Sequence, residues 1–207
     1  CFSNIPQTIR SLFSDTLSPD LNPGLLTGIS PPYDTVILFY IDAFGWRFWE
    51  EHCEKSPFLK RMKSEGLVSK ITSQFPSTTS AHVTTIHSGL PVGQSGVYEW
   101  QYYEPLLDAM FSPLLFSFAG DKQRETVNKA DVDLAQIFPQ GTIYRRLRSD
   151  GVRSCVLQNR IYNATTYSKH LLKGSRIVSY TTFPQALVSL GQLLAQQDTP
   201  TYYFLYF

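Results

Sequence analysis

Asp42 and Thr79 are the two side chains whose type and position could support chemistry in this sequence. Asp42 follows "DTVILFYI", an apolar and β-branched run that is typical of a parallel strand buried on both faces. Thr79 lies in "QFPSTTSAHVTTIHSG" (74–89), at the expected start of a helix. Because ligands of open α/β sheets gather at the carboxyl ends of the strands, both residues are expected at one edge of the sheet.

The two residue types suggest phosphoryl chemistry. A carboxylate at a strand end has to be paired or has to bind metal, because burial of a lone charge is unfavourable. A helix N-terminus attracts phosphate oxygens, and a hydroxyl there could attack phosphorus if a metal lowered its pKa, as zinc lowers that of water from about 15.7 to about 7. Taken alone, each residue also has a plainer interpretation: Asp42 as a cap of the next loop or helix, and Thr79 as an ordinary N-cap.

Strands alternate with helices along the chain. Strands are expected over residues 34–42, 67–75, 152–159, 177–180 and 201–207, and helices over residues 56–66, 79–89, 141–151 and 183–197. This order predicts an α/β domain with a mainly parallel central sheet flanked by helices. Residues 1–33, rich in Pro, Ser, Asn and Gly, are expected to form an irregular arm or short helix before a domain spanning residues 34–207. Residues 90–135 show no clear period and are expected to hold loops and short elements.

Composition excludes several classes of function. Hydrophobic residues make up 43% of the 207, so a sizeable core can form. The formal net charge is +1 and no basic block occurs, which disfavours a nucleic-acid-binding surface. The three cysteines (Cys1, Cys53 and Cys155) lack CxxC spacing, which disfavours a structural zinc site. No apolar run has the length of a membrane span, and no signal peptide is seen, although the sequence lacks an initiator Met and the compartment stays open.

The motifs resemble a known family when they are taken in order. "VILFYIDAFGWRF", followed by "SPFLKRMKSEGLVSKITSQFPSTTSAHVTTIHSGLPVGQSGV", resembles the type I phosphodiesterase / nucleotide pyrophosphatase family of the alkaline phosphatase superfamily. That family has an apolar strand ending in Asp, then P-x-L-x-x-L-x-x-x-G, F-P-[TS]-x-T and [TS]-G-L-x-P-x-x-H-G. "TIYRRLRSDGVRSCVL" is similar to the helix–strand pair that follows, so the resemblance covers residues 34–206.

The resemblance implies roles for two residues. Asp42 matches the first metal-binding aspartate, and Thr79 matches the nucleophile, which in the family also ligates a metal and carries the covalent intermediate. The implied cofactors are two divalent metal ions, with zinc as the expected metal, and the implied substrate is a small phosphoester or nucleotide-like molecule. Ser95 replaces the family's histidine, and no asparagine follows it nearby, which puts nucleotide specificity in doubt. The nearby Tyr98, Trp100 and Tyr102 could stack on a substrate ring or simply pack together.

The other metal ligands of the family are absent from this sequence. They typically include an Asp directly after a strand resembling "TYYFLYF" and a His four residues later. The four histidines (His52, His82, His87 and His170) are expected in structural roles, with His82 the nearest to the site. We therefore expect a truncated domain with little or no activity and an unpaired hydrophobic strand at its end, through which a homodimer could form.

Two hypotheses stay open at this point. The first is the N-terminal part of a metal-dependent phosphodiesterase or phosphomonoesterase, with mutase relatives included and sulfatases disfavoured because no C/S-x-P-x-R signal occurs. The second is a non-catalytic binding or scaffolding domain of the same fold, in which Thr79 is a helix cap.

Overall fold

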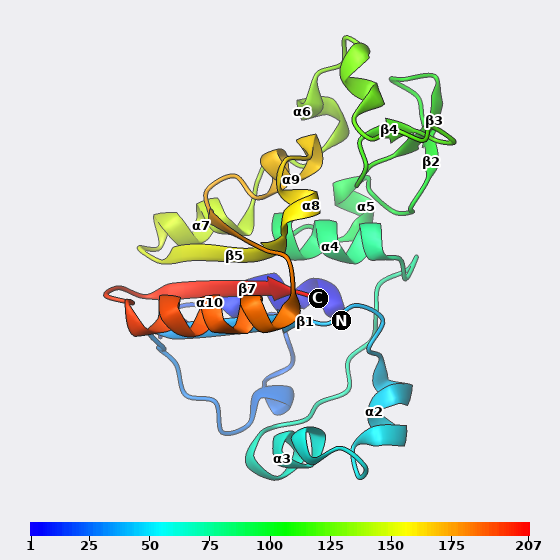
Figure 1. Ribbon diagram of the computed structural model, residues 1–207. Helices are drawn as coiled ribbons and strands as arrows, with labels where there is room; N and C mark the ends of the chain where they lie inside the picture. The colour runs from blue at the N-terminus through cyan, green and yellow to red at the C-terminus, as the bar shows by residue number, and fades with distance from the viewer.

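A four-stranded parallel sheet forms the centre of the computed structural model, which describes residues 1–207. The strands lie in the order β1-β7-β5-β6 (Figure 1). Their bounds are Thr35–Tyr40 for β1, Arg153–Asn159 for β5, Arg176–Tyr180 for β6 and Thr201–Tyr206 for β7. Helices flank this sheet, which confirms the predicted α/β class and is consistent with an alkaline-phosphatase-like fold.

Helices cover the sheet on both faces. Helix α10 (Phe183–Ala195) lies on one face, where Ala186 and Leu190 pack against strand residues such as Leu157 and Leu205. The other face is covered by α1 (Ile5–Ser11), α4 (Thr79–Ser88) and α7 (Ile143–Ser149). Their core side chains, packed on Tyr202 and Phe204 of β7, are Ile9, Ile86, Ile143, Tyr144 and Leu147. Figure 1 shows α10 in front of the sheet and α1 behind it.

A second core lies beside α4 and is built from the region without a clear period. This region contains α5 (Val92–Ser95), the antiparallel strands β2 (Tyr102–Glu104), β3 (Ala109–Ser112) and β4 (Ser117–Phe118), η3 (Thr126–Lys129) and α6 (Leu134–Ile137). The short helices α8 (Arg160–Asn163) and α9 (Thr166–Leu171) follow β5. The core side chains that join this region to α4 and α9 are Val83, Val97, Phe111, Phe116, Phe138 and Tyr167.

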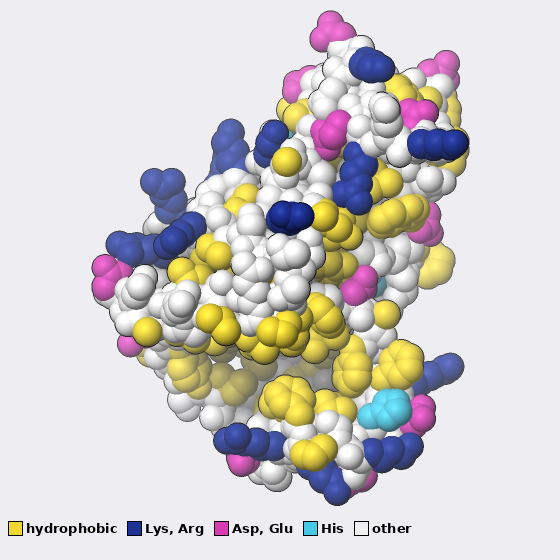
Figure 2. All heavy atoms as spheres, viewed as in Figure 1, with side chains coloured by type: hydrophobic (Ala, Val, Ile, Leu, Met, Phe, Trp, Pro, Cys, Tyr) yellow, Lys and Arg dark blue, Asp and Glu magenta, His cyan; other side chains and the backbone are white.

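The segment between β1 and α4 extends away from the sheet (Figure 1). It contains α2 (Trp46–His52) and α3 (Pro57–Glu65), neither of which buries a residue, and Phe58 of α3 is 66% exposed. Figure 2 shows a hollow between this segment and the sheet that is lined largely by hydrophobic side chains. None of the helices combines the length and apolarity that crossing a membrane requires.

The strand predicted over residues 67–75 is wrong. These residues pair with no strand. Their polar groups contact the N-terminal region instead, where the amide of Phe2 donates to the carbonyl of Thr72 at 2.8 Å and Ser69 Oγ donates to the carbonyl of Leu25 at 3.1 Å. Alternating side chains are therefore not sufficient, because a strand also needs a neighbour for its backbone. The 3₁₀ helices η1 (Phe2–Asn4) and η2 (Pro23–Leu26) lie in this N-terminal region.

Two further expectations about the sheet are corrected. The strand β1 is not buried on both faces, and its Phe39 is 44% exposed, because β1 is an edge strand that pairs only with β7. The expected unpaired end strand, β7, is a central strand that pairs with β1 on one side and β5 on the other. The open edges of the sheet therefore belong to β1 and β6.

Candidate active site

The backbone of Asp42 is fixed at the carboxyl end of the sheet. Its amide donates to the carbonyl of Phe207 at 2.8 Å, and the amide of Phe207 donates to the carbonyl of Tyr40 at 2.9 Å. These bonds continue the β1–β7 ladder beyond the strands. Oδ1 of Asp42 accepts the amide of Ala43 at 2.9 Å, so half of the carboxylate caps the following turn. The other oxygen, Oδ2, is left for side-chain partners.

Thr79 is the first residue of α4, and Thr78 caps the helix. Oγ1 of Thr78 accepts the amide of Ala81 at 3.3 Å, which is the expected contact of an N-cap residue. The hydroxyl of Thr79 is not needed for this purpose and donates to Oδ2 of Asp42 at 3.3 Å. The structure thus brings together the two residues singled out in the sequence, and the interpretation of Thr79 as the N-cap does not hold.

Tyr206 is a third member of this cluster that the sequence reasoning missed. Its hydroxyl donates to Oδ2 of Asp42 at 3.0 Å. Burial raises the pKa of Tyr206 well above its ordinary value, and the adjacent Asp42 charge raises it further. The pKa of Tyr40 is raised for the same two reasons. Tyr40 and Tyr206 pair in the parallel register of β1 and β7, and this register, which neither strand shows by itself, places both residues near Asp42.

The Asp42 carboxylate accepts hydrogen bonds from neutral donors. None of the ion pairs in the structure includes Asp42, although the residue is solvent-exposed. Its partners are the hydroxyls of Thr79 and Tyr206 and the amide of Ala43. The first N–H groups of α4 also have no intrahelical acceptors. The site thus combines one carboxylate with a helix end that favours negative charge.

A cavity of about 200 Å³ opens beside Asp42 and Thr79. It lies among α4, the ends of β5 and β7, and the region of the second core. Its lining includes apolar side chains (Val83, Leu114, Leu115, Leu172 and Phe204) and polar ones (His87, Gln158, Thr165 and Ser168). Trp100 also lines it and is 44% exposed, whereas Tyr98 stacks on the buried Tyr102 with ring centroids 4.6 Å apart. Of the three aromatic residues considered in the sequence, Trp100 is the one placed to meet a ligand in this cavity.

The histidines have structural partners. His87 is buried in α4, contacts the Tyr144 hydroxyl through Nδ1 at 2.7 Å, and has its pKa lowered to about 3 by burial. Both ring nitrogens of His82 contact backbone groups, the amide of Gln74 and the carbonyl of Thr78. His52 stacks on Phe48, and Nε2 of His170 lies 3.0 Å from the carbonyl oxygen of Pro139.

The donor set matches part of a metal site. Oxygens of Asp42 and Thr79 lie 3.3 Å apart, and carboxylate and alkoxide oxygens can ligate a divalent ion. No group of three or more His, Cys, Asp or Glu side chains is arranged to hold a metal ion. Protein zinc sites use three or four protein ligands. Asp42 and Thr79 therefore fit two ligand positions of one site but do not complete it. The three cysteines are free.

Comparison with known proteins agrees with these motifs. Residues 36–207 match the type I phosphodiesterase / nucleotide pyrophosphatase family. Comparisons with curated proteins and with solved structures give no match. The family match covers the Asp42–Thr79 pair and all of the central sheet except Thr35, the first residue of β1. The chain therefore belongs to the type I phosphodiesterase / nucleotide pyrophosphatase family.

Proposed function

We propose that this protein is a phosphoric ester hydrolase in which Thr79 is the nucleophile. The observation that carries the proposal is the 3.3 Å contact between Thr79 Oγ1 and Asp42 Oδ2 at the first turn of α4. Family membership supports a hydrolase of the phosphodiesterase or pyrophosphatase type. The hydroxyl stands where a helix N-terminus favours the negative charge of a phosphoryl group.

The chain's own residues would act in three ways. Asp42 holds the Thr79 hydroxyl through Oδ2 and thereby orients its oxygen. Thr79 Oγ1 would form a bond to phosphorus as the bond to the leaving oxygen breaks. The hydroxyl proton would pass through Asp42 Oδ2 to solvent, and the leaving oxygen would take a proton from solvent. Water would then cleave the phosphothreonine bond and restore the hydroxyl. The free N–H groups of α4 would stabilise the charge that develops on the phosphoryl oxygens.

The family is generally metal-dependent, and we propose two divalent ions, preferably zinc, as the cofactors. Asp42 and Thr79 are the residues of this chain that would ligate them. When bound, a divalent ion lowers the pKa of a coordinated hydroxyl and neutralises phosphoryl charge. Because the described donor set is incomplete, we expect less than one zinc per chain and very weak turnover from the 207-residue polypeptide.

We propose a small phosphoester or nucleotide-like substrate. The cavity beside Thr79 is large enough for one ester group, and its apolar wall with Trp100 at the lining suits an aromatic or short aliphatic group. The carboxylate of Asp42 is left unpaired by any cation, so a substrate phosphate would need a metal or the helix N-terminus to offset the repulsion.

One observation favours a second candidate function. The absence of a group of three or more metal-ligating side chains is compatible with a non-catalytic binding or scaffolding domain of the same fold. In that case the cavity would bind a ligand without turnover, and the Thr79 hydroxyl would serve only to hold Asp42.

The test is hydrolysis of bis(p-nitrophenyl) phosphate with added zinc. We compare the parent with Thr79→Ala and with Ser77→Ala, an exposed neighbouring hydroxyl that serves as a matched control. We expect Thr79→Ala to abolish release of p-nitrophenol and Ser77→Ala to retain it. Equal turnover in the parent and Thr79→Ala would rule out the nucleophile. No zinc-dependent turnover in the parent, combined with saturable binding of p-nitrophenyl phosphate, would favour the non-catalytic alternative.

A further inference from the structure

His82, in the first turns of α4, binds two backbone groups of the segment that precedes Thr79. Nδ1 lies 2.8 Å from the carbonyl oxygen of Thr78, and Nε2 accepts the amide of Gln74 at 3.3 Å. A carbonyl oxygen can only accept and an amide N–H can only donate. Nδ1 must therefore carry the proton, and His82 is held as the neutral Nδ1–H tautomer.

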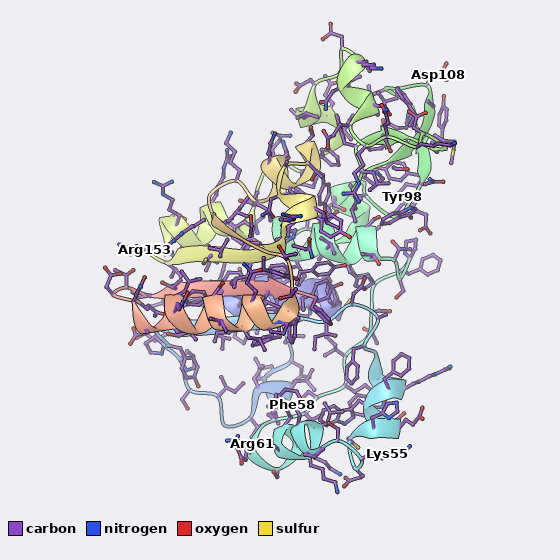
Figure 3. All side chains as sticks on the ribbon, in the orientation of Figure 1. Lys55, Phe58, Arg61, Tyr98, Asp108 and Arg153 are labelled. Atoms are coloured by element: carbon purple, nitrogen blue, oxygen red, sulfur yellow. The ribbon has the colours of Figure 1, made fainter.

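These contacts join the two ends of the turn that leads into α4. At one end, the Gln74 side chain donates to Thr85 Oγ1 at 2.9 Å and accepts the amide of Val92 at 3.1 Å. At the other end, Oγ1 of Thr78 donates to the carbonyl of Tyr98 at 3.0 Å. Tyr98 is labelled in Figure 3, close to the end of α4 where the helix begins. His82 contacts both ends through a single side chain.

The middle of the turn has little support of its own. Phe75 is 92% exposed, and Ser77 is also exposed. The His82 ring, in contrast, is 8% exposed and packs edge-on against Phe2 with ring centroids 4.4 Å apart. A buried ring with two satisfied nitrogens is held in one orientation. The direction in which the chain enters α4 therefore depends on this ring.

We infer that His82 is a positioning residue for Thr79. By holding Gln74 and Thr78 to α4, it fixes the backbone directly before Thr79 and so directs Oγ1 toward Asp42. The inference deepens the proposed function and rests on Thr79 as the reacting residue. It also means that the Nε2 lone pair of His82 is used by the Gln74 amide and is not free to ligate a metal in this arrangement.

Three substitutions separate the two contacts from the packing. His82→Asn places an amide nitrogen close to the position of Nδ1, so it can keep the bond to Thr78 and loses the bond to Gln74. His82→Gln places an amide oxygen close to the position of Nε2, so it can keep the bond to Gln74 and loses the bond to Thr78. His82→Phe keeps the ring against Phe2 and loses both bonds.

The first measurement is independent of turnover. We expect the ¹⁵N chemical shifts of the parent imidazole to show the Nδ1–H tautomer. Amide hydrogen exchange at Gln74 should be about tenfold faster or more in His82→Asn and His82→Phe, and near the parent rate in His82→Gln. An Nε2–H tautomer, or equal exchange at Gln74 in the parent and His82→Phe, would overturn the inference.

The second measurement is zinc-supported hydrolysis of bis(p-nitrophenyl) phosphate. We expect His82→Phe to lower kcat by about 10- to 100-fold with little change in KM, because displacement of a reacting atom by about 1 Å has effects of this size. His82→Asn and His82→Gln should retain intermediate rates. Unchanged kcat in His82→Phe, with Thr79→Ala inactive, would overturn the positioning role alone. Parent-like turnover in Thr79→Ala would instead overturn the proposed nucleophile, and the exchange data would still decide whether His82 holds the turn.

Discussion

The hydroxyl of Tyr206 lies 3.0 Å from Oδ2 of Asp42 and donates a hydrogen bond to it. The same carboxylate oxygen accepts the hydroxyl of Thr79 at 3.3 Å. Three parts of the chain that are distant in sequence, the ends of β1 and β7 and the start of α4, thus meet at one oxygen atom. A change in the charge of Asp42 should therefore alter the hydrogen bonds that both hydroxyls donate to it.

Asp42→Asn is expected to lower the pKa of Tyr206. Burial is the largest cause of the raised pKa of Tyr206. The negative charge of Asp42 raises the pKa further, because tyrosinate and carboxylate repel each other. Removal of that charge should shift the transition toward the ordinary value, and burial should keep the remaining part of the increase. The measurement is a titration followed by the ultraviolet absorbance of tyrosinate, with Tyr206→Phe used to assign the transition. Identical titrations for the parent and Asp42→Asn would contradict the contact.

His87 should make the fold less stable in acid. Its pKa is lowered to about 3 by burial, whereas an unfolded histidine has a pKa near 6.5. Between these values the unfolded chain binds more protons than the folded one, so stability falls as the pH falls through this window. We expect a contribution of about 2 kcal/mol to the free energy of unfolding to be lost between pH 6 and pH 4.

The matched variant for this effect carries His87→Phe together with Tyr144→Phe, which removes both hydrogen-bonding partners at once. Urea unfolding of the parent and the double variant at both pH values gives the difference. Equal pH dependence in the two proteins would show that His87 does not remain neutral when folded.

Two neighbouring buried tyrosines should respond oppositely to loss of their hydroxyls. Tyr144 and Tyr202 are both fully buried, with ring centroids 6.4 Å apart. The Tyr202 hydroxyl has no hydrogen-bond partner, whereas the Tyr144 hydroxyl contacts His87. Tyr202→Phe should raise the free energy of unfolding by about 1 kcal/mol, and Tyr144→Phe should lower it by a similar amount. Destabilisation by both substitutions would indicate a partner, such as an ordered water, at Tyr202.

We propose that the chain self-associates through the open edge of β1. This strand pairs with β7 on one side only, and Phe39 and Ile41 beside that edge are 44% and 45% exposed. Unpaired strand edges with apolar side chains can pair with a second chain. Sedimentation equilibrium should show a mass that rises with concentration in the parent and falls to the monomer value in Phe39→Lys. Ile177→Lys, on the other open edge of the sheet, should behave as the parent. A monomeric parent at every concentration would make this prediction wrong.

The strong local patterns predicted most of the elements. The helix expected over residues 79–89 is confirmed, because α4 covers Thr79–Ser88, with Thr78 as its N-cap and Gly89 at φ 72° after its last residue. The helix expected over residues 141–151 is α7, which covers Ile143–Ser149 and begins after the capping Thr142. Such signals are local because a cap side chain contacts the backbone two or three residues away.

What the sequence could not predict depends on contacts between distant residues. Residues 67–75 alternate like a strand and have no neighbouring strand, and the position of β7 between β1 and β5 follows from pairing rather than composition. In the candidate site, Asp42 and Thr79 were predicted because each ends or begins an element. Tyr206 and the two-sided contact of His82 were not, because they require the register of β1 with β7 and the path of the turn over α4.

The order of the strands has a consequence for how the chain acquires its structure. Thr35 of β1 pairs with Thr201 of β7, so the first strand finds its partner only after the other strands of the sheet have been synthesised. The pairs that β7 makes with β1 and with β5 cannot form before β7 is available. Pairing across such a separation in sequence is slow. Until β7 has been synthesised, the apolar strand β1 has no partner strand and can aggregate or bind a chaperone.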